Sequence, residues 1–284
     1  MQSLKNRAAI INKIRKFFAT QNVLEVQTPM LQNYPLSDVY IDSVLVKING
    51  KNKFLHTSPE LEMKKLLANG LGDIYQICPV FRDNEQGSNN FNEFTLLEYY
   101  RLGFDIFQLM DNIIELLKIL GVKHKNLRLT YAQVFFEYAD IDILNTDFNA
   151  LKKIAKTHKL STDFEHIEDL QMLLFVHLIE PKLARLPLVF IYAFPQSQSA
   201  LARIEAAVAQ RFELYINGVE IANGYDELRR GNSYQQRFEA EISKRKKLGK
   251  TPVNLDADFI ENLQNPLPQC SGVAIGIERL LSQI

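Results

Sequence analysis

The sequence has no excess of charge of either sign, because 33 Lys and Arg residues face 33 Asp and Glu residues. A protein that mainly grips a phosphate backbone usually carries a basic excess, so nucleic acid is not the expected ligand. Cysteine is scarce: Cys78 and Cys270 are the only two, and they fit neither a disulfide framework nor a zinc site. A reducing cytoplasm is therefore the expected compartment.

Long apolar runs are missing as well. The longest, over 183–194, is interrupted by Arg185 and falls short of the roughly 18 residues of a membrane span. The N-terminal segment is broken by Asn12, Lys13 and Arg15, so it lacks the apolar stretch of a signal peptide. We expect a soluble, intracellular protein with no membrane partner.

What the sequence does contain is enough apolar residues, 46% of 284, for a large core. Helical spacing of apolar residues, capping residues and turn signals predict helices over 3–20, 58–70, 105–120, 147–158, 167–180, 232–249 and 256–264. Strand patterns are expected over 23–30, 39–56, 73–81, 93–101, 187–192, 211–224 and at the start of 271–281. Hairpins mixed with helices predict a single α+β domain, residues 1–284, with a mostly antiparallel sheet.

The hairpin over 211–224 is expected to bring two carboxylates together. With Asn217-Gly218 as a two-residue turn, the register places Glu213 opposite Ala222. Glu213 and Glu220 then become diagonal neighbours on one face, with about 7 to 8 Å between their Cα atoms. The opposite, apolar face would consist of Phe212, Leu214, Ile216, Val219 and Ile221.

Two carboxylates on one face repel each other unless a cation lies between them. We expect no Lys or Arg at the adjoining positions of that face. A divalent ion would fit, because Mg²⁺ is commonly held by one or two carboxylates together with substrate phosphates. The alternative is a solvated hairpin face with ordinary Glu residues, and the hairpin by itself favours that alternative.

A second candidate site begins at Arg82, after the strand expected over 73–81. Its forked guanidinium can hold an anion next to the polar segment that follows. On the returning strand, Phe94, Glu98 and Tyr100 project to one face, and an aromatic ring beside a carboxylate suits an ammonium group. An ordinary edge-strand surface is the alternative, and it is favoured on this segment alone.

Three further segments carry weaker signals. In GVAIGIER, over 272–279, Gly272 and Gly276 allow a ligand to approach the backbone, although small residues at such a junction usually serve packing. KRKK, over 244–247, is expected to be a solvated helix face. Cys270 is expected to be a small buried residue.

Taken in order, these segments resemble the three motifs of class II aminoacyl-tRNA synthetases, and most closely the lysyl branch. The matching segments are VLEVQTPM, FR with NEFTLLE, RFE with VEIANGYDEL, and GVAIGIER. The resemblance runs from the first helix to residue 281. It implies a six- to seven-stranded, mostly antiparallel sheet flanked by helices, and a homodimer with Pro29 at its interface.

The resemblance also implies an ATP site. Arg82 would be the catalytic residue, holding the α-phosphate and the amino-acid carboxylate, while Phe94 and Arg279 would sandwich the adenine. Glu213 and Glu220 would handle Mg²⁺ and ATP. The implied ATP-binding residues are Arg82, Asp83, Asn84, Phe91, Phe94, Glu213, Leu214, Gly276 and Arg279.

An amino-acid pocket is implied beside the ATP site. Its implied residues are Ser58, Glu60, Glu98, Tyr100, Glu220, Asn223, Tyr225, Glu227 and Ala274. A pocket that contains Glu60, Glu98 and Glu227 suits a substrate with a second ammonium group, because a buried carboxylate needs a cationic partner.

Two features differ from an ordinary lysyl-tRNA synthetase. The motifs begin close to Met1, so we expect no β-barrel for the anticodon, and Ala274 stands where the synthetase has Gly. Both features, together with CSGVA, QQRFE and FPQSQSALA, resemble the stand-alone paralogues that ligate (R)-β-lysine onto a lysine of translation elongation factor P. The resemblance implies an ATP-dependent, AMP-forming ligase that activates (R)-β-lysine or lysine as an adenylate, without tRNA.

The loop of the second motif departs from the family. Asn84 stands in place of a Glu, Ser88 in place of an Arg that reaches the terminal phosphate, and Asn90-Phe91 in place of His-Asn. A lost charge-assisted contact costs roughly 1.5 to 3 kcal/mol. Two alternatives therefore stay open: a weakened paralogue that only binds ATP or an amino acid, and a lysyl-adenylate former with another amine acceptor. The last helix stops at Ile284 where the family continues, and two interpretations stay open: a naturally short chain or a truncated C-terminus.

Overall fold

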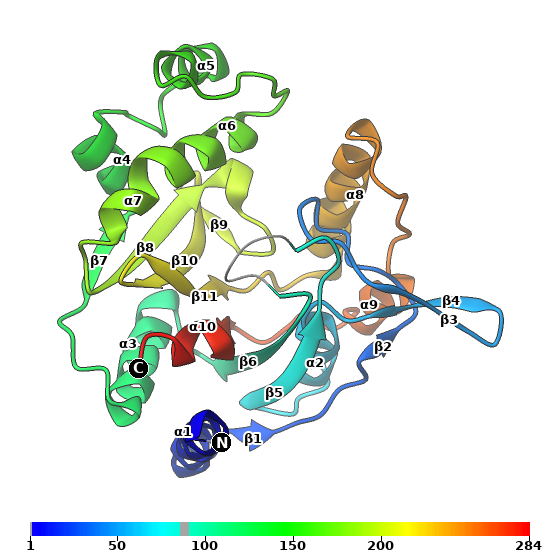
Figure 1. Ribbon diagram of the computed structural model, residues 1–284. Coiled ribbons are helices and arrows are strands. Elements are labelled where there is room, and N and C mark those ends of the chain that lie inside the picture. Colours follow the sequence, from blue (N-terminus) through cyan, green and yellow to red (C-terminus); the bar gives the residue numbers. More distant parts are fainter. Residues whose placement is uncertain (1, 86–90) are drawn as a thin grey trace. The chain divides into compact units, whose positions relative to one another are not determined.

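The computed structural model describes residues 2–85 and 91–284, and it divides into two compact units (Figure 1). The first unit comprises Met1–Val122, Asp226–Ser282 and Ile284. The second unit comprises Lys123–Tyr225 and Gln283. The single domain expected over 1–284 stays a prediction.

Four strands form the sheet of the first unit, in the order β1 (Leu24–Glu25), β5 (Ile74–Phe81), β6 (Glu93–Leu102) and β12 (Cys270–Gly276). β1 runs parallel to β5, whereas β5, β6 and β12 are antiparallel neighbours. This arrangement places the second-motif strands beside the third-motif strand that ends in Gly276.

One face of this sheet carries the core of the first unit, beneath α1 (Gln2–Thr20) and α3 (Ile106–Leu120). The ring of Phe18 stacks on Tyr75, with 4.4 Å between ring centroids, and lies 4.9 Å from Tyr99. α3 begins with a capping box between Asp105 and Gln108. Because strand side chains alternate between faces, this apolar packing leaves Glu98 and Tyr100 on the other face.

The remaining elements of the first unit are a small sheet and four helices. The small sheet has the order β2 (Leu31–Gln32), β4 (Lys51–Leu55) and β3 (Leu45–Ile48). Both residues of the turn Asn49-Gly50 have positive φ, as the turn signal predicts. The helices are α2 (Glu60–Ala68), α8 (Gly231–Lys247), α9 (Ala257–Asn262) and α10 (Ile277–Leu281).

The second unit is built on β11 (Val219–Asp226), β10 (Val208–Ile216), β8 (Leu188–Pro195) and β7 (Leu127–Thr130), in that order, with the short β9 (Ile204–Glu205) paired to β10. Helical segments pack on these strands; they are α4 (Tyr131–Ala139), α5 (Phe148–Thr157), α6 (Ile167–Leu174), a π-helical turn (Phe175–Ile179), α7 (Glu180–Leu183) and a 3₁₀ turn (Gln196–Gln198). The ring of Tyr131 stacks on Phe175 at 5.3 Å in their shared core.

The predicted fold class, α+β with a mostly antiparallel sheet, is confirmed. Outside the small sheet, nine strands are present among the described residues instead of six or seven, because β1, β7 and β9 are short additions. The strand expected over 23–30 is present only as β1, and β2 begins after Pro29, whose ring leaves no N–H for a ladder. The helix expected from Ser58 begins at Glu60.

In the part of the chain that the structure describes, no helix combines the length and the apolar character needed to cross a membrane.

Candidate active site

The floor of the candidate site is the face of β5, β6 and β12 that lies opposite α1 and α3. The register pairs Glu98 with Gln76 on one side and with Ala274 on the other, and it pairs Tyr100 with Gly272. A Cβ atom at position 272 would come within 2.7 Å of a carboxylate oxygen of Glu227, and closer still to the ring of Tyr100. Glycine is therefore required there, because two pocket side chains lie over its backbone.

Glu98 is a buried carboxylate at the centre of this floor. Tyr100 donates a hydrogen bond of 2.7 Å to its Oε1 atom, and Oε2 has no hydrogen-bond partner in the described structure. Burial raises the pKa of Glu98 to about 8, and the nearby Glu60 carboxylate acts in the same direction. An incoming ammonium group would satisfy the unpaired oxygen.

Glu60 and Glu227, the other two predicted pocket carboxylates, are paired with a lysine of the chain itself. The ammonium of Lys64 lies 2.6 Å from Glu60 and 2.7 Å from Glu227. Lys64 is fully buried, and its ammonium lies 5.2 Å from the ring centroid of Tyr234. Helix α2 thus supplies, four residues after Glu60, a cation of the chain itself for two of the three carboxylates.

Arg82 follows the last residue of β5 and extends along the same face. Its guanidinium carbon lies 5.0 Å from the ring centroid of Phe94, and its Nε donates to the carbonyl oxygen of Thr57 at 3.4 Å. Ser58 is close in sequence, and its hydroxyl accepts a hydrogen bond from the backbone of Glu60. This geometry holds the guanidinium over an aromatic ring at the end of a rigid strand, which suits an anion-binding role.

Arg279 lies on α10 directly after β12. Its side-chain carbons lie 3.8 to 3.9 Å from the place a Cβ atom would take at Gly276. The preceding residue, Glu278, accepts hydrogen bonds from the backbone of Thr95 at 2.9 Å and from Arg7 at 3.0 Å. These contacts fix the start of α10 to β6 and α1, so the backbone that carries Arg279 is rigidly placed.

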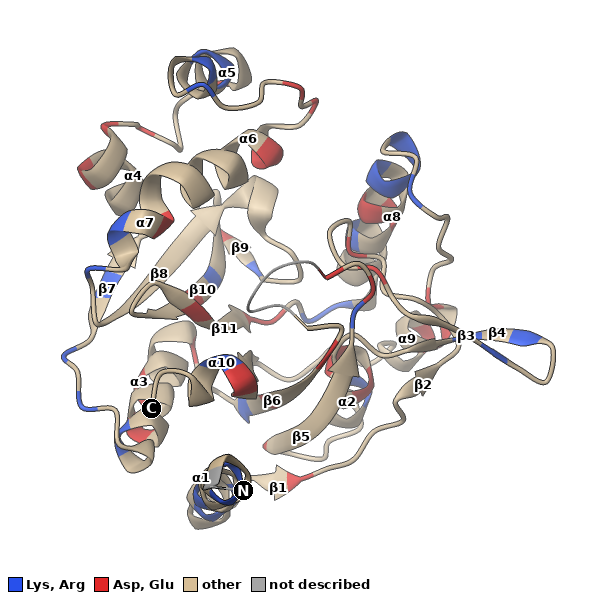
Figure 2. Cartoon of the chain, viewed as in Figure 1, with Lys and Arg blue, Asp and Glu red and all other residues tan. Residues whose placement is uncertain are grey.

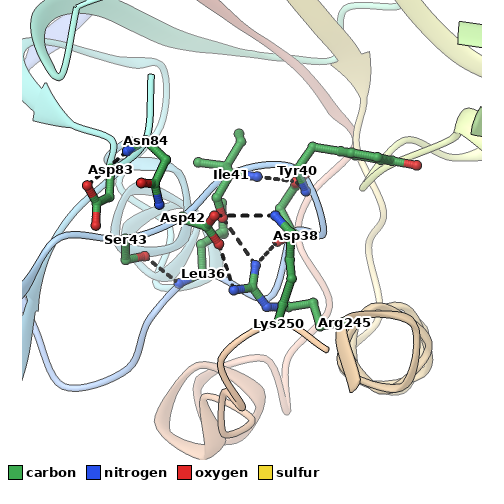
Figure 3. A network of polar contacts seen from close by, with 10 residues as sticks. All are labelled: Leu36, Asp38, Tyr40, Ile41, Asp42, Ser43, Asp83, Asn84, Arg245 and Lys250. Carbon is green, nitrogen blue, oxygen red and sulfur yellow. Dashed lines mark hydrogen bonds and ion pairs between the residues drawn. The ribbon is translucent and has the colours of Figure 1, made fainter. Parts of the chain in front are cut away.

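A polar network around the buried Arg245 reaches the beginning of the loop that follows Arg82 (Figure 3). Arg245 on α8 donates to the carbonyl oxygens of Asp38 and Ile41 and forms an ion pair of 2.8 Å with the Asp42 carboxylate. The carbonyl oxygen of Asp42 in turn accepts a hydrogen bond of 2.8 Å from the backbone of Asp83. Helix α8 thus fixes, through one segment, the residue next to Arg82.

This network corrects the expectation that KRKK is a solvated helix face. Figure 2 shows Lys and Arg gathered at the C-terminal end of α8. Within this group Arg245 is only 3% exposed, and the ammonium of Lys244 donates a hydrogen bond of 2.7 Å to the Tyr40 hydroxyl. The sequence lacked a signal for these contacts because their partners lie about 200 residues away.

The loop itself is described only in part. Asn84 has a left-handed backbone with φ of 59°, and its N–H donates to the Asp83 carboxylate at 2.8 Å. Phe91 is 54% exposed. Ser88 and Asn90, the other two departures from the family, lie outside the described residues.

The hairpin of the second unit differs from its expected register. Ile216 faces Val219 and Tyr215 faces Glu220, but an extra residue then shifts the pairing, so that Glu213 lies opposite Asn223 and not Ala222. Such a bulge changes which side chains share a face. It moves Asn223 and Tyr225, two residues implied for substrate binding, onto the face of Glu213 and Glu220. The turn signal could not reveal it, because a turn fixes the register only next to itself.

A second correction concerns charge on this hairpin face. Arg211 lies two residues before Glu213 and therefore shares its face. Its guanidinium forms an ion pair with Glu213, donates to the side-chain oxygen of Asn223 at 3.2 Å and lies 4.4 Å from the ring centroid of Phe194. The expectation of no Lys or Arg beside the carboxylates is therefore wrong.

The hairpin carboxylates still fit a divalent ion. Burial raises the pKa of Glu213, Arg211 opposes this effect, and the nearby Glu220 carboxylate adds to it. Further positive charge would therefore be favourable there.

Leu214 is fully buried on the other face of β10, so only its backbone could meet ATP. In the described chain no group of three or more His, Cys, Asp or Glu residues suits a metal, which leaves a site of two carboxylates that phosphate oxygens would complete.

The whole chain, residues 1–284, matches the family model of class II tRNA synthetases (D, K and N). The chain belongs to this family. The class II synthetase resemblance inferred from the motifs is thus confirmed.

Several curated relatives share about two fifths of the sequence with this class II family member. A Vibrio cholerae protein and a Hamiltonella defensa protein are each 41% identical over 293 aligned residues, which cover 99% of this chain and 90% of the relative. A Yersinia enterocolitica protein is 39% identical over 291 residues, covering 98% and 90%. All three are named elongation factor P–(R)-β-lysine ligase.

Among the residues implied by the class II motifs, the structure brings Glu60, Glu98, Tyr100, Glu227 and Ala274 to one face of the first unit. The residues of the second unit that share a face are Glu213, Glu220, Asn223 and Tyr225. Sequence reasoning missed Lys64 and Arg211, although each had a local signal: Lys64 is four residues from Glu60 on a helix, and Arg211 is two residues from Glu213 on a strand.

We expect Glu98→Gln to reduce the loss of stability that occurs as the pH rises. The folded-state pKa of Glu98 is raised from its usual 4.5 to about 8. Between these values the unfolded chain has released the proton and the folded chain has kept it, so the free energy of unfolding falls as the pH rises. Urea unfolding at pH 5 and pH 8 should show a fall about 3 to 4 kcal/mol smaller in the variant.

Glu93→Gln is the matched control for this measurement, because Glu93 lies exposed on the same strand. Equal pH dependence in Glu98→Gln and the parent protein would show that Glu98 is already ionised at pH 5.

We expect Arg245→Met to lower the free energy of unfolding by about 3 kcal/mol, because breaking a buried ion pair leaves its partners unsatisfied. Lys247→Met, an exposed neighbour on the same helix, should change it by less than about 0.5 kcal/mol. Urea unfolding measures both. Similar small losses in the two variants would contradict an anchoring role for Arg245.

Proposed function

We propose that this protein is an ATP-dependent, AMP-forming ligase that activates (R)-β-lysine as an adenylate and transfers it to a lysine side chain of translation elongation factor P. The relatives named for this activity are 39–41% identical across almost the whole chain, which supports the predicted ligase. The structural observation that carries the proposal is the buried Glu98, whose unpaired oxygen suits the ammonium group of a diamino acid.

In the first step, the carboxylate of the amino acid attacks the α-phosphorus of ATP, the bond to the bridging oxygen breaks, and pyrophosphate leaves. The guanidinium of Arg82 would hold the α-phosphate and the attacking carboxylate together, so that most of the rate enhancement comes from orientation. Its fixed position over Phe94 means that little rearrangement is needed when negative charge develops.

In the second step, the ε-amine of the acceptor lysine attacks the carbonyl carbon of the mixed anhydride, and AMP leaves. Glu213 and Glu220 would hold Mg²⁺ with phosphate oxygens of ATP, and the bound ion supplies positive charge at the phosphates. Glu98 and Tyr100 hold the amino acid in the pocket through its ammonium group, so the reacting carbonyl keeps its place between the two steps.

The proposal includes a homodimer, a cytoplasmic location and an acceptor that is not tRNA. Leu24, Met30 and Leu31 lie around the first-motif Pro29 and are 50%, 44% and 40% exposed. Exposed apolar side chains gathered in one segment support an interface there. The balanced net charge supports a protein acceptor over tRNA.

Amino-acid-dependent ATP–pyrophosphate exchange tests the proposal. We expect exchange with (R)-β-lysine, slower exchange with L-lysine, and none with neutral or acidic amino acids, because only a second ammonium group satisfies Glu98. Transfer of the labelled amino acid to elongation factor P then identifies the acceptor. The protein should be shown to be folded by circular dichroism before the assay.

Two outcomes would count against the ligase. If a folded protein shows no ATP–pyrophosphate exchange with any amino acid, the alternative of a paralogue that only binds would be favoured, because ATP or an amino acid could still bind without reacting. Strong exchange without transfer to elongation factor P would favour an adenylate former that serves another amine.

We expect Ala274→Gly to broaden acceptance toward L-lysine. Ala274 lies directly across from Glu98 in the sheet, so its methyl group limits the space beside the pocket carboxylate. Loss of one methyl group is expected to reduce the preference for (R)-β-lysine over L-lysine, as the ratio of kcat/KM values, by about tenfold. The melting temperature is the control, since Gly weakens a strand. Unchanged selectivity would remove Ala274 from the specificity argument.

A further inference from the structure

The pocket of the first unit contains an uncommon number of buried charges. Lys64, Glu98 and Glu227 are 0%, 3% and 1% exposed, and Glu60, paired with Lys64, has 20% of its side chain exposed. A buried charge without a partner of opposite sign is costly. Each charge in this pocket therefore needs a counter-charge, either from another side chain of the protein or from a ligand.

The position of the Lys64 ammonium is confined by its neighbours, because both of its acidic partners are held in place by the fold. Glu60 lies one helical turn before it on α2. Glu227 is fixed by its backbone N–H, which donates to the carbonyl oxygen of Cys270 on β12 at 3.1 Å. Tyr234 closes the remaining side with its ring, and its hydroxyl donates to the Leu228 carbonyl oxygen at 2.8 Å. The ammonium therefore bridges two carboxylates.

Lys64 keeps its proton in this setting. Burial alone would lower the pKa of Lys64, but the carboxylates of Glu227 and Glu60 outweigh burial and hold that pKa well above its usual value. A permanent positive charge thus sits inside a pocket that is expected to receive a positively charged substrate. A pocket meant only to attract cations would not contain it.

Counting the charges of the pocket residues shows what Lys64 contributes to the net charge of the site. Three ionised carboxylates and one ammonium leave two negative charges, and a substrate with two ammonium groups would neutralise both. Without Lys64 the pocket would carry a third negative charge that no diamino acid could satisfy. Asp226 is not counted, because its charge acts on Glu227 more weakly than the charges of Lys64 and Glu60.

We propose that Lys64 is a specificity-determining residue, which cancels one of three pocket carboxylates so that the site matches a substrate with two ammonium groups. This inference rests on the proposed function for the identity of the diamino acid. It adds that the selection depends on a cation of the protein itself as well as on the carboxylates.

A consequence is that substrate binding and proton release are linked. Around Glu98 the titratable groups are Glu60 and Lys64 on α2, Glu227 after β11, Tyr100 on its own strand and Cys78 on β5. Since burial and Glu60 raise the pKa of Glu98, the empty pocket holds a proton near neutral pH. A substrate ammonium takes the place of that proton, so binding at pH 7 releases about one proton.

Three variants test the charge count: Lys64→Met, Glu227→Gln and the double variant. Each single change alters the pocket charge by one, in opposite directions, and the double variant restores the parent count. We expect each single change to reduce kcat/KM for (R)-β-lysine about 100-fold, as for the loss of one partner of a buried pair. The double variant should return to within about tenfold of the parent.

Calorimetry supplies a readout that a purely structural role would not move. Titrations at pH 7 in buffers of different ionisation enthalpy give the number of protons released on binding. Glu227→Gln should release fewer protons than the parent, because the loss of one carboxylate leaves Lys64 to favour ionised Glu98 in the empty pocket. The double variant should match the parent. If Lys64→Met does not fold, Glu227→Gln and the double variant still carry the comparison.

Two probes separate this inference from the proposed function. 1,5-Diaminopentane has two ammonium groups and no carboxylate, and 3-aminohexanoic acid lacks the distal ammonium of (R)-β-lysine. Binding of the diamine that is weakened in both single variants and restored in the double variant, in a protein whose parent form shows no exchange with any amino acid, would refute the ligase and keep the charge count. Exchange in the parent, with a double variant weaker than both single variants, would overturn the role of Lys64 and leave the ligase intact.

Discussion

The constraint on which the candidate site depends is the cost of burying charge. Lys64, Glu98 and Glu227 lie almost without solvent contact, so each must find its counter-charge within a few ångströms. Lys64 meets two of the carboxylates, which leaves Glu98 with a tyrosine hydroxyl and one unsatisfied oxygen. Glu98 is therefore satisfied only when a cation or a proton reaches its second oxygen, and this supports the proposed amino-acid pocket.

Backbone features make this concentration of charge possible. Glycine at position 272 lets Tyr100 and Glu227 lie over the same stretch of β12, where a Cβ atom would collide with both. On the hairpin of the second unit, one extra residue in β11 brings Asn223 to the face of Glu213. In both places, the glycine and the extra residue interrupt regular strand structure. Each interruption lies where polar side chains come together.

The sequence predicted the fold class and the faces of the strands well, because the alternation of residues within a strand and the order of the motifs can both be read along the chain without knowledge of the tertiary fold. Glu98 and Tyr100 share a face as expected. The pairing of Glu213 was wrong by one residue, since a bulge between Tyr215 and Leu214 leaves no mark in hydrophobic alternation when the inserted Ile221 is itself apolar. Arg245 could not be predicted at all, because its partners are determined only by the tertiary fold.

The use of basic residues also bears on the acceptor. A synthetase that binds tRNA needs Lys and Arg free to meet phosphates. Here three of the most deeply placed basic side chains, Lys64, Arg211 and Arg245, are held in ion pairs with carboxylates of the same chain. With a net charge of zero, each cation used internally is one fewer for a nucleic-acid surface. These internal ion pairs are compatible with the proposed substrates, a small diamino acid and a protein lysine, neither of which needs an extended basic surface.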